Sequence, residues 1–238
     1  MPPSWRSRVF DRLAPPLART TSRLIEQRDP AARTTFFDLD AFPWVAEVER
    51  RWTAIRDEMA AVRDAGDIPG IEEVAPGLDA LSDDRRWKTF FLFANDRPVH
   101  GNSARCPETV RALSAIPGMS TAYFSLLSPG KHIPAHDGVY KGLLRYHLGL
   151  QIPTQHERCR IRVGSDVRPW RQGQSFIFDD TFNHEVWNET EEERVILLVD
   201  FLRPLPRALD LMNRAAVRAL SSISWVELAH DRLPMGGR

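Results

Sequence analysis

The sequence LLRYHLGLQI at residues 143–152 decides the fold that we expect for this chain. It is rich in apolar and aromatic side chains, Gly142 precedes it and Pro153 ends it, which is the pattern of a buried strand. Similar short segments, separated by turn residues such as Pro129-Gly130 and Gly164-Ser165, lie at residues 122–127, 159–163, 175–179 and 194–202. No helical pattern alternates with them, so we predict antiparallel strands that form a double-stranded β-helix, or jelly roll.

Helices are predicted on both sides of this β-rich region. From Asp40, a candidate N-cap, apolar residues recur every three or four positions up to Gly66, and a shorter helix is expected over residues 107–116. Residues 87–94 read as a strand. After Pro204 and Pro206, helical spacing returns in a series of apolar residues: Leu209, Met212, Ala216, Leu220 and Ile223. The fold class is therefore mainly β with flanking N-terminal helices and a C-terminal helix.

Composition excludes several classes of protein. The 238 residues are 42% hydrophobic and 27% charged, which is enough apolar material for a real core. The 32 basic and 32 acidic side chains cancel, so we expect no nucleic-acid partner. No apolar run is long enough for a transmembrane segment. Two cysteines, Cys106 and Cys159, cannot form a disulfide scaffold, which favours the reducing cytoplasm.

The charges are unevenly distributed along the chain. Residues 1–35 contain seven arginines against three acids, and residues 203–238 contain six arginines against three acids. The centre is correspondingly acidic. A solvated surface explains this distribution, but basic ends also favour peripheral contact with an anionic membrane.

Histidines are the most informative chemical groups in the sequence. Five of the seven lie between residues 132 and 184, and the HExxH pattern of zinc proteases is absent. His136 stands at a strand entry rich in proline and glycine, and His184 begins a later strand. In a jelly roll these two segments can lie side by side at the open end and direct both imidazoles at one metal ion. Arg194, at the start of the next strand, is placed to bind a carboxylate with its planar fork of donors.

A site with two histidines and open coordination positions suits ferrous iron, which must bind an oxidant and a co-substrate together. The motifs around these residues also resemble a known family. They are YFSLLSPGKHIPAH at 123–136, LRYHLGL at 144–150, FDDTFNHEVW at 178–187 and RVILLVD at 194–200. These segments resemble the aspartyl/asparaginyl β-hydroxylases, which are Fe(II)- and 2-oxoglutarate-dependent oxygenases with a jelly-roll core. The resemblance covers about half of the chain.

The resemblance implies a role for each matching residue. His136 and His184 would bind Fe(II), Arg194 and Ser125 would bind the distal carboxylate of 2-oxoglutarate, and Arg145 with His147 would lie near its other end. The related oxygenases that use a third, carboxylate ligand place it two residues after the first histidine, where this chain has Gly138. The β-hydroxylases also lack it, so either water or the adjacent Asp137 fills that position.

The carboxylates of Asp179 and Asp180 precede His184, and we expect them to form a turn or to orient an imidazole N–H. Trp87 and Trp170 are expected to pack in the core or to line a pocket. The domain organisation that follows is an irregular basic arm at 1–35, a jelly-roll oxygenase domain with N-terminal helices at 36–202 and a C-terminal helix at 203–238.

Three functions remain open at this point. The first is a dioxygenase that hydroxylates the β-carbon of an Asp- or Asn-type amino acid or peptide. The second performs the same chemistry on a lipid acyl chain, as some bacterial members of the family do on lipid A. The third is a non-catalytic, cupin-like module whose histidines hold a structural metal. The substrate is therefore a small molecule, a peptide or a lipid.

Overall fold

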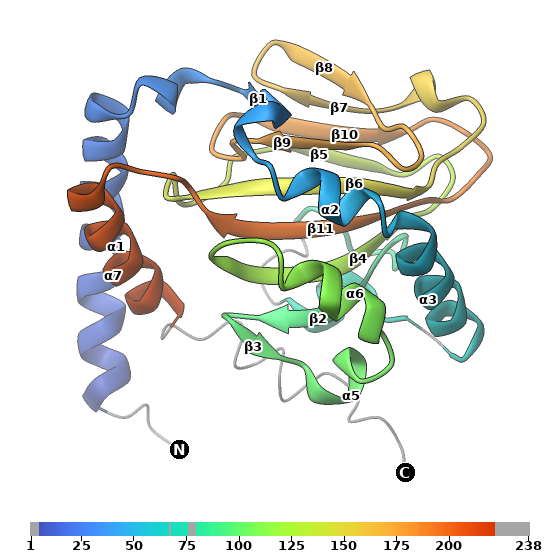
Figure 1. Ribbon diagram of the computed structural model, residues 1–238, viewed down its shortest axis with the longest axis horizontal. Coiled ribbons are helices and arrows are strands. Elements are labelled where there is room, and N and C mark those ends of the chain that lie inside the picture. Colours follow the sequence, from blue (N-terminus) through green and yellow to red (C-terminus); the bar gives the residue numbers. More distant parts are fainter. Residues whose placement is uncertain (1–4, 67, 76–79, 222–238) are drawn as a thin grey trace.

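Two antiparallel sheets form the centre of the protein (Figure 1). The computed structural model describes residues 5–66, 68–75 and 80–221. The large sheet has the strand order β1-β9-β6-β11-β4-β2-β3, and the small sheet has the order β5-β10-β7-β8. The strands are β1 (Phe36–Phe37), β2 (Trp87–Ala94), β3 (Arg97–Pro98), β4 (Met119–Leu127), β5 (His132–His136), β6 (Leu143–Gln151), β7 (Cys159–Val163), β8 (Asp166–Pro169), β9 (Ser175–Phe178), β10 (His184–Asn188) and β11 (Arg194–Leu202).

The jelly-roll prediction is confirmed by this topology. Strands β6, β11 and β4 lie side by side in the large sheet although they are far apart in the sequence, and β5 pairs with β10 in the small sheet. Strands β2, β7 and β11 have the predicted bounds or lie within them, and β6 ends one residue earlier than predicted. Residues with strong β propensity and turn residues at both ends explain this agreement.

Alternation along the strands divides the large sheet into two faces. On β6, Leu144, Tyr146 and Leu148 face a cluster of apolar residues outside the sheet pair. The residues between them, Arg145 and His147, face the small sheet. The same period of two holds on β11, where Leu197 belongs to the outer cluster and Ile196 to the inner one. One strand therefore supplies the apolar core and the candidate site from alternate residues.

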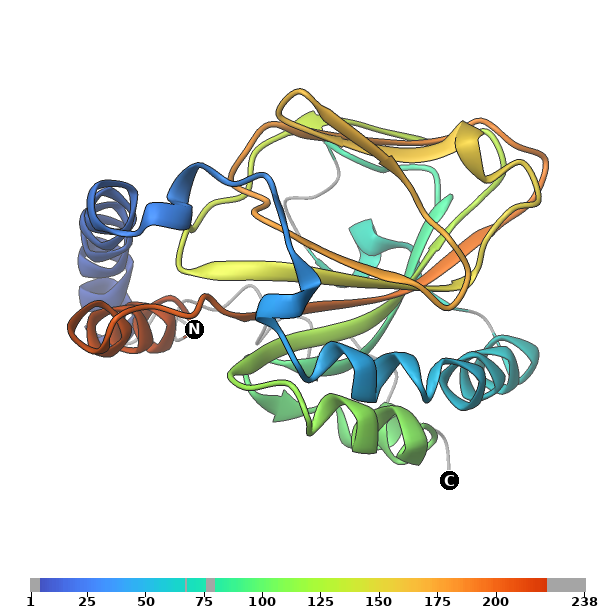
Figure 2. The ribbon, with the colours of Figure 1, turned by 45° about the horizontal axis from the view of Figure 1, so that its top comes forward.

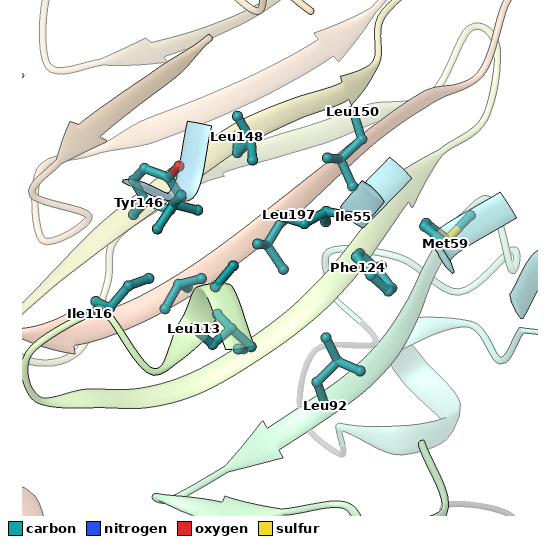
Figure 3. Close-up of a cluster of buried hydrophobic side chains, with 14 of the residues drawn as sticks. Ile55, Met59, Leu92, Leu113, Ile116, Phe124, Tyr146, Leu148, Leu150 and Leu197 are labelled. Atoms are coloured by element: carbon teal, nitrogen blue, oxygen red, sulfur yellow. The ribbon is translucent and has the colours of Figure 1, made fainter. Parts of the chain in front are cut away.

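Helices cover the outer face of the large sheet (Figure 2). These are α2 (Val45–Glu49), α3 (Trp52–Asp64) and α6 (Pro107–Leu113), and short helices α4 (Ile71–Val74) and α5 (His100–Ser103) lie near β2. Figure 3 shows part of the resulting core, which contains Ile55 and Met59 of α3 together with Phe124 and Leu197 of the sheet. This packing anchors the strands that carry the inner-face residues.

The single helix expected between residues 40 and 66 is instead divided. Asp38, not Asp40, caps a short 3-10 helix at Leu39–Ala41, and a turn at Arg50 and Arg51 separates α2 from α3. The sequence contains no proline or glycine at that turn. Glu47 forms ion pairs with both arginines of the turn, at 3.0 Å to Arg51. The apolar periodicity therefore predicted the buried face correctly, but the prediction of one continuous helix is wrong.

The prediction of an irregular arm at residues 1–35 is wrong for most of its length. Helix α1 spans Trp5–Arg28 and includes Pro15 and Pro16, although proline is unfavourable inside a helix. Buried Ala18, Thr21 and Ile25 follow one face of α1 at helical spacing. A second short 3-10 helix follows at Pro30–Arg33, with Asp29 as its N-cap. Tertiary packing thus overrides the local signal of the prolines.

The predicted C-terminal helix is present as α7 (Arg207–Ser221) and packs against α1 at one end of the sheets (Figure 1). Leu209 and Ala216 are buried as expected, but Met212 is 37% exposed and Asn213 is fully buried in its place. Ile223 lies outside the described residues. None of the described helices combines the length and apolar character that crossing a bilayer requires.

Candidate metal and co-substrate site

His136 and His184 face each other across two paired strands. His136 is the last residue of β5, His184 is the first residue of β10, and the two are direct partners in the antiparallel register. Their ring centroids are 4.1 Å apart. The predicted meeting of two imidazoles that are 48 positions apart in the sequence is therefore present.

Both imidazoles are fixed by the same kind of hydrogen bond. Nδ1 of His136 lies 2.8 Å from the carbonyl oxygen of Pro134, and Nδ1 of His184 lies 3.0 Å from that of Phe182. A carbonyl only accepts, so each Nδ1 carries the hydrogen and donates it. The lone pair of each ring is then on Nε2, which is the arrangement that a metal-binding histidine with a fixed tautomer shows.

The same surroundings keep the two rings neutral. Burial lowers the pKa of His136, and it lowers the pKa of His184 to about 3, where the neighbouring His136 and Arg145 act in the same direction. A protonated imidazole has no lone pair for a metal, so a lowered pKa favours binding.

Arg194 is a buried cation without an anionic partner. Its side chain is 2% exposed, and Nη2 donates to Ser125 Oγ at 3.1 Å. Among the described residues it has no ion pair, and its Nε has no hydrogen-bond partner. Burial lowers the pKa of Arg194 to about 10. Because an unpaired buried charge is costly, this position fits a ligand that supplies a negative charge.

Ser125 points to the same kind of ligand. Its oxygen accepts hydrogen bonds from Arg194 and, at 3.0 Å, from the indole N–H of Trp87. Two donors use both lone pairs, so the hydroxyl hydrogen of Ser125 is left to donate. Thr89, its partner on β2, has a fully buried hydroxyl with no hydrogen bond among the described residues.

His147 adds another donor to this group. Trp170 Nε1 donates to His147 Nδ1 at 3.3 Å, so the hydrogen of His147 is on Nε2. That Nε2 is buried and has no partner within the described part of the chain. Burial and the charges of Arg145 and Arg194 hold the pKa of His147 well below its ordinary value, so the ring stays neutral. The Arg194 guanidinium also lies 4.8 Å from the centre of the Trp170 ring. Two buried donors beside Trp170, Arg194 Nε and His147 Nε2, therefore lack an acceptor among the described residues.

Arg145 differs from these residues because its charge is already paired. Its Nε and Nη2 bind Asp200 at 2.8 and 3.2 Å, and Nη2 also lies 3.1 Å from Asp180. Burial, opposed by Arg145, raises the pKa of Asp180 to about 6. The structure thus places Arg145 beside the histidines but in a network of two carboxylates, and its binding of a co-substrate stays a prediction.

The expectation that Asp179 or Asp180 orients an imidazole is wrong. Backbone carbonyls perform that role, as described above. Asp179 is fully buried and binds Lys141 at 3.0 Å, Arg203, and the backbone and hydroxyl of Thr181. It therefore fixes the turn that leads into β10, as the alternative expectation held.

Among the described residues, no third side chain that could bind a metal joins the two histidines. Within the described ranges, no group of three or more His, Cys, Asp or Glu side chains gathers in a way that could hold a metal. The carboxylate of Asp137 accepts a hydrogen bond from Asn183 at 2.9 Å on the surface. A Cβ at Gly138 would lie 2.5 Å from the Asp180 carboxylate, so the space beside Gly138 is filled. Two imidazoles and a neighbouring set of donors fit a ferrous ion with an anionic, chelating co-substrate.

One hollow in the protein is separate from this site. It has a volume of about 310 Å³, lies between α6, β4, β11 and α7, and none of the candidate site residues lines it.

Sequence reasoning named most of the residues that the structure places around this candidate site and missed some of the residues that contact them. It named the two histidines, Arg194, Ser125, Arg145 and His147, which all lie on the inner faces of the strands. It did not assign Thr89 a role, and it did not foresee that Asp200 pairs with Arg145. The register β6–β11 places Asp200 opposite Arg145, but the sequence alone does not state that register.

Comparison with known proteins agrees with these observations. The aspartyl/asparaginyl β-hydroxylase family matches residues 49–204. An ornithine lipid ester-linked acyl 2-hydroxylase from Rhizobium tropici is 42% identical over 180 residues, which are 75% of this chain and 64% of that protein. The human aspartyl/asparaginyl β-hydroxylase is 34% identical over 165 residues, which are 67% of this chain and 21% of that protein. The chain therefore spans less than two thirds of either relative.

Among solved structures, one match is a cupin domain of a transcriptional regulator from Enterobacter cloacae. It has a TM-score of 0.35 and 11% sequence identity, and the match covers 50% of this chain and 99% of that one.

Proposed function

Because the chain belongs to the aspartyl/asparaginyl β-hydroxylase family, we propose that it is an Fe(II)- and 2-oxoglutarate-dependent dioxygenase, and that it hydroxylates an acyl chain of a lipid. The observation that carries the co-substrate assignment is the buried, unpaired guanidinium of Arg194 beside donors that lack acceptors. A dicarboxylate supplies the missing acceptors and the missing negative charge.

Fe(II) would be held by Nε2 of His136 and of His184. When bound, iron supplies the activation of dioxygen, with 2-oxoglutarate as the source of electrons. The chain's own contribution to the metal is to keep both rings neutral and oriented. The carbonyls of Pro134 and Phe182 fix the tautomers, and burial opposes protonation.

The distal carboxylate of 2-oxoglutarate would bind Arg194 and the hydroxyl of Ser125. The indole of Trp87 holds Ser125, and the ring of Trp170 lies against the Arg194 guanidinium. Both contacts restrict motion of the donors before the ligand arrives, which lowers the entropy that binding loses. His147 Nε2 would donate to the same co-substrate, and Arg145 would remain near its other end.

Aromatic residues close the inner side of this site. Phe176, Phe178 and Trp170 pack around His147 with ring centroids 5.0 to 5.9 Å away. Such a wall excludes water, which strengthens the interaction between Arg194 and a carboxylate.

The substrate assignment rests on the relatives. The 42% identity to a lipid acyl hydroxylase exceeds the 34% identity to the human β-hydroxylase and extends over more of this chain. We therefore favour the lipid over the Asp- or Asn-type substrate that the sequence analysis placed first. Membership of a hydroxylase family argues against the non-catalytic cupin-like module.

The test is succinate formation under controlled exposure to oxygen. Purified protein is loaded anaerobically with Fe(II) and 2-oxoglutarate, then exposed to oxygen with an ornithine lipid or with a peptide that contains Asp and Asn. We expect succinate to rise with the lipid and mass spectrometry to show one added oxygen on its acyl chain. A rise with the peptide alone would overturn the substrate assignment. No 2-oxoglutarate binding, measured by calorimetry, would overturn the co-substrate assignment.

A further inference from the structure

We propose that the exposed face of α7, together with the neighbouring part of α1 and the loop at 137–142, docks on an anionic lipid bilayer and holds the loop that follows His136 against it. The lipid substrate class rests on the proposed function, whereas the docking surface rests on the contacts and charges described below.

Helix α7 exposes apolar and basic residues on the side that does not pack on the protein. Leu211 is 71% exposed and Met212 is 37% exposed. Arg207 is exposed and lies one helical turn from Leu211. Arg214 and Arg218 are also exposed, but they border the hollow beside α6 and β4. The sequence of α7 contains one acid, Asp210, which pairs with Arg214 at 2.8 Å. Exposed apolar side chains beside an arginine are a feature of helices that lie in the plane of a membrane surface.

Helix α1 extends the positive charge. Arg19, Arg23 and Arg28 are exposed, against one exposed acid, Glu26, among its described side chains. Within the described residues these three arginines and Arg207 form no ion pair. Figures 1 and 2 both show α1 and α7 side by side at one end of the sheets. The basic residues of the two chain ends, which are far apart in the sequence, thus gather in one region.

The loop between β5 and β6 connects this region to the candidate site. Its residue Tyr140 donates to Asn213 of α7 at 2.7 Å, and Asn213 donates to the Gly142 carbonyl at 2.8 Å. Ser22 of α1 accepts from the backbone of Lys141 at 3.4 Å. The loop starts directly after His136, so α1 and α7 hold the segment that leaves the metal site.

Val139 of this loop is the most exposed large apolar residue of the described chain, at 88%. Its neighbour Tyr140 donates a hydrogen bond to Asn213, which follows Met212 in α7. The exposed side chains of Val139 and Met212 are therefore adjacent to the two residues that this hydrogen bond joins. Unpaired arginines complement anionic headgroups, and protruding apolar residues complement the acyl region beneath them. A nucleic acid offers phosphates for the arginines but no apolar layer for Val139 and Leu211.

Vesicle co-sedimentation of the whole chain tests the proposal. We use vesicles of equal parts phosphatidylcholine and phosphatidylglycerol, with pure phosphatidylcholine vesicles for comparison. We expect binding to the anionic vesicles that weakens as salt increases. Replacing Arg207→Gln together with Leu211→Asn should reduce the affinity roughly 20-fold, since one arginine near an anionic surface contributes about fivefold and a partly inserted leucine a similar factor. Val139→Asn should reduce it about threefold.

A matched control uses the same residue types elsewhere. Arg158→Gln with Val167→Asn alters an exposed arginine and an exposed valine next to the small sheet, and it should leave vesicle binding unchanged. All altered side chains are exposed, so the thermal unfolding of each variant should match that of the unaltered chain. Equal binding to both vesicle types, no binding at all, or equal loss in the control would overturn the docking surface.

Calorimetry with 2-oxoglutarate separates the two proposals. If vesicle binding fails while 2-oxoglutarate binds, the docking surface is wrong and the co-substrate assignment stands. If vesicle binding follows the expected order while 2-oxoglutarate fails to bind, the docking surface stands and the proposed chemistry is wrong. Binding to a protein or nucleic acid that displaces the vesicles from α7 would assign this surface to another partner.

Discussion

The two faces of the large sheet are built from the same strands, but one face is packed with apolar side chains and the other carries buried polar groups. On β11, Leu197 and Val199 face the helices and belong to the apolar core, whereas Arg194 and Asp200 lie on the opposite face. The outer face is complete in itself because each apolar side chain finds a neighbour. On the inner face, Arg194 Nε and His147 Nε2 find no hydrogen-bond partner in the part of the chain that the structure describes. Apolar packing satisfies the side chains of the outer face, whereas the donors of the inner face would be satisfied by the proposed ligand.

The largest expected contrast comes from Arg194→Met. The change removes the guanidinium from the proposed carboxylate site and leaves a side chain of similar length in the pocket. We expect affinity for 2-oxoglutarate to fall by about 2 to 5 kcal/mol, with Fe(II) binding much less affected. Because the arginine is buried and unpaired in the ligand-free protein, we also expect the free energy of unfolding to rise by about 1 kcal/mol or more.

Calorimetry with 2-oxoglutarate and denaturant unfolding of the ligand-free protein measure the two effects. Equal losses of Fe(II) and 2-oxoglutarate affinity would refute the assignment of Arg194. A less stable variant would show that Arg194 serves the fold instead.

Leu197→Ala is the counterpart on the outer face. The side chain is fully buried among apolar residues, so truncation should lower the free energy of unfolding by about 2 to 5 kcal/mol. Affinity for 2-oxoglutarate, measured where the variant is still folded, should stay within about twofold, since sites without shared partners behave additively. A large loss of affinity would mean that the two faces are coupled.

The sequence predicted the outer face and the inner face for different reasons. Strands β2, β7 and β11 were predictable because alternating or continuous apolar residues end at turn residues, and local sequence carries that information. The pairing of His136 with His184 was predictable only because family motifs and jelly-roll topology together implied it. Spacing in the sequence does not by itself bring distant residues together.

Other features depend on contacts that local sequence does not encode. Pro15 and Pro16 indicated an irregular arm, yet the packing of Ile25 and its neighbours maintains helix α1. The pairing of Arg145 with Asp200 follows from the strand register, which the side chains on both faces fix together. The donors without acceptors are visible only once burial and hydrogen bonds are known. They are the strongest indication of a ligand in the molecule.

The two faces should also differ in their effect on stability at low pH, because the buried histidines lie on the inner side of the large sheet. The pKa of His184 is lowered to about 3 in the folded protein, and those of His136 and His147 are also lowered. In the unfolded chain a histidine titrates near its ordinary value of about 6.5, so below that pH the unfolded state binds more protons and stability falls. The raised pKa of Asp180, about 6, opposes this trend because the folded state then binds a proton more readily.

We expect the metal-free protein to lose about 1 to 2 kcal/mol through His184 between pH 7 and pH 5, and His184→Gln to remove that part of the loss. Denaturant unfolding at the two pH values, in the presence of a chelator, measures it. Leu197→Ala, which alters no titrating group, should lose as much stability on acidification as the unaltered chain. If the His184→Gln variant shows the same pH dependence as the unaltered chain, then His184 is not held neutral by burial.

The smallest expected effect concerns Asp137, which follows the proposed metal ligand His136 and yet belongs to the surface. Its carboxylate accepts a hydrogen bond from Asn183, and the side chain is exposed, whereas His136 faces its partner His184 across the small sheet. Asp137 is the first residue after β5, and the hydrogen bond from Asn183 holds its carboxylate at the surface, so Asp137 should contribute no ligand. Asp137→Ala should therefore change Fe(II) affinity by less than about 0.5 kcal/mol, which is usual for a surface substitution. His136→Ala, measured beside it by anaerobic metal titration, should abolish tight binding because it removes one of two protein ligands. If Asp137→Ala weakened Fe(II) binding tenfold, the Asp137 carboxylate would have to turn towards the metal when it binds. Asp137, and not water, would then occupy the position of the missing carboxylate ligand.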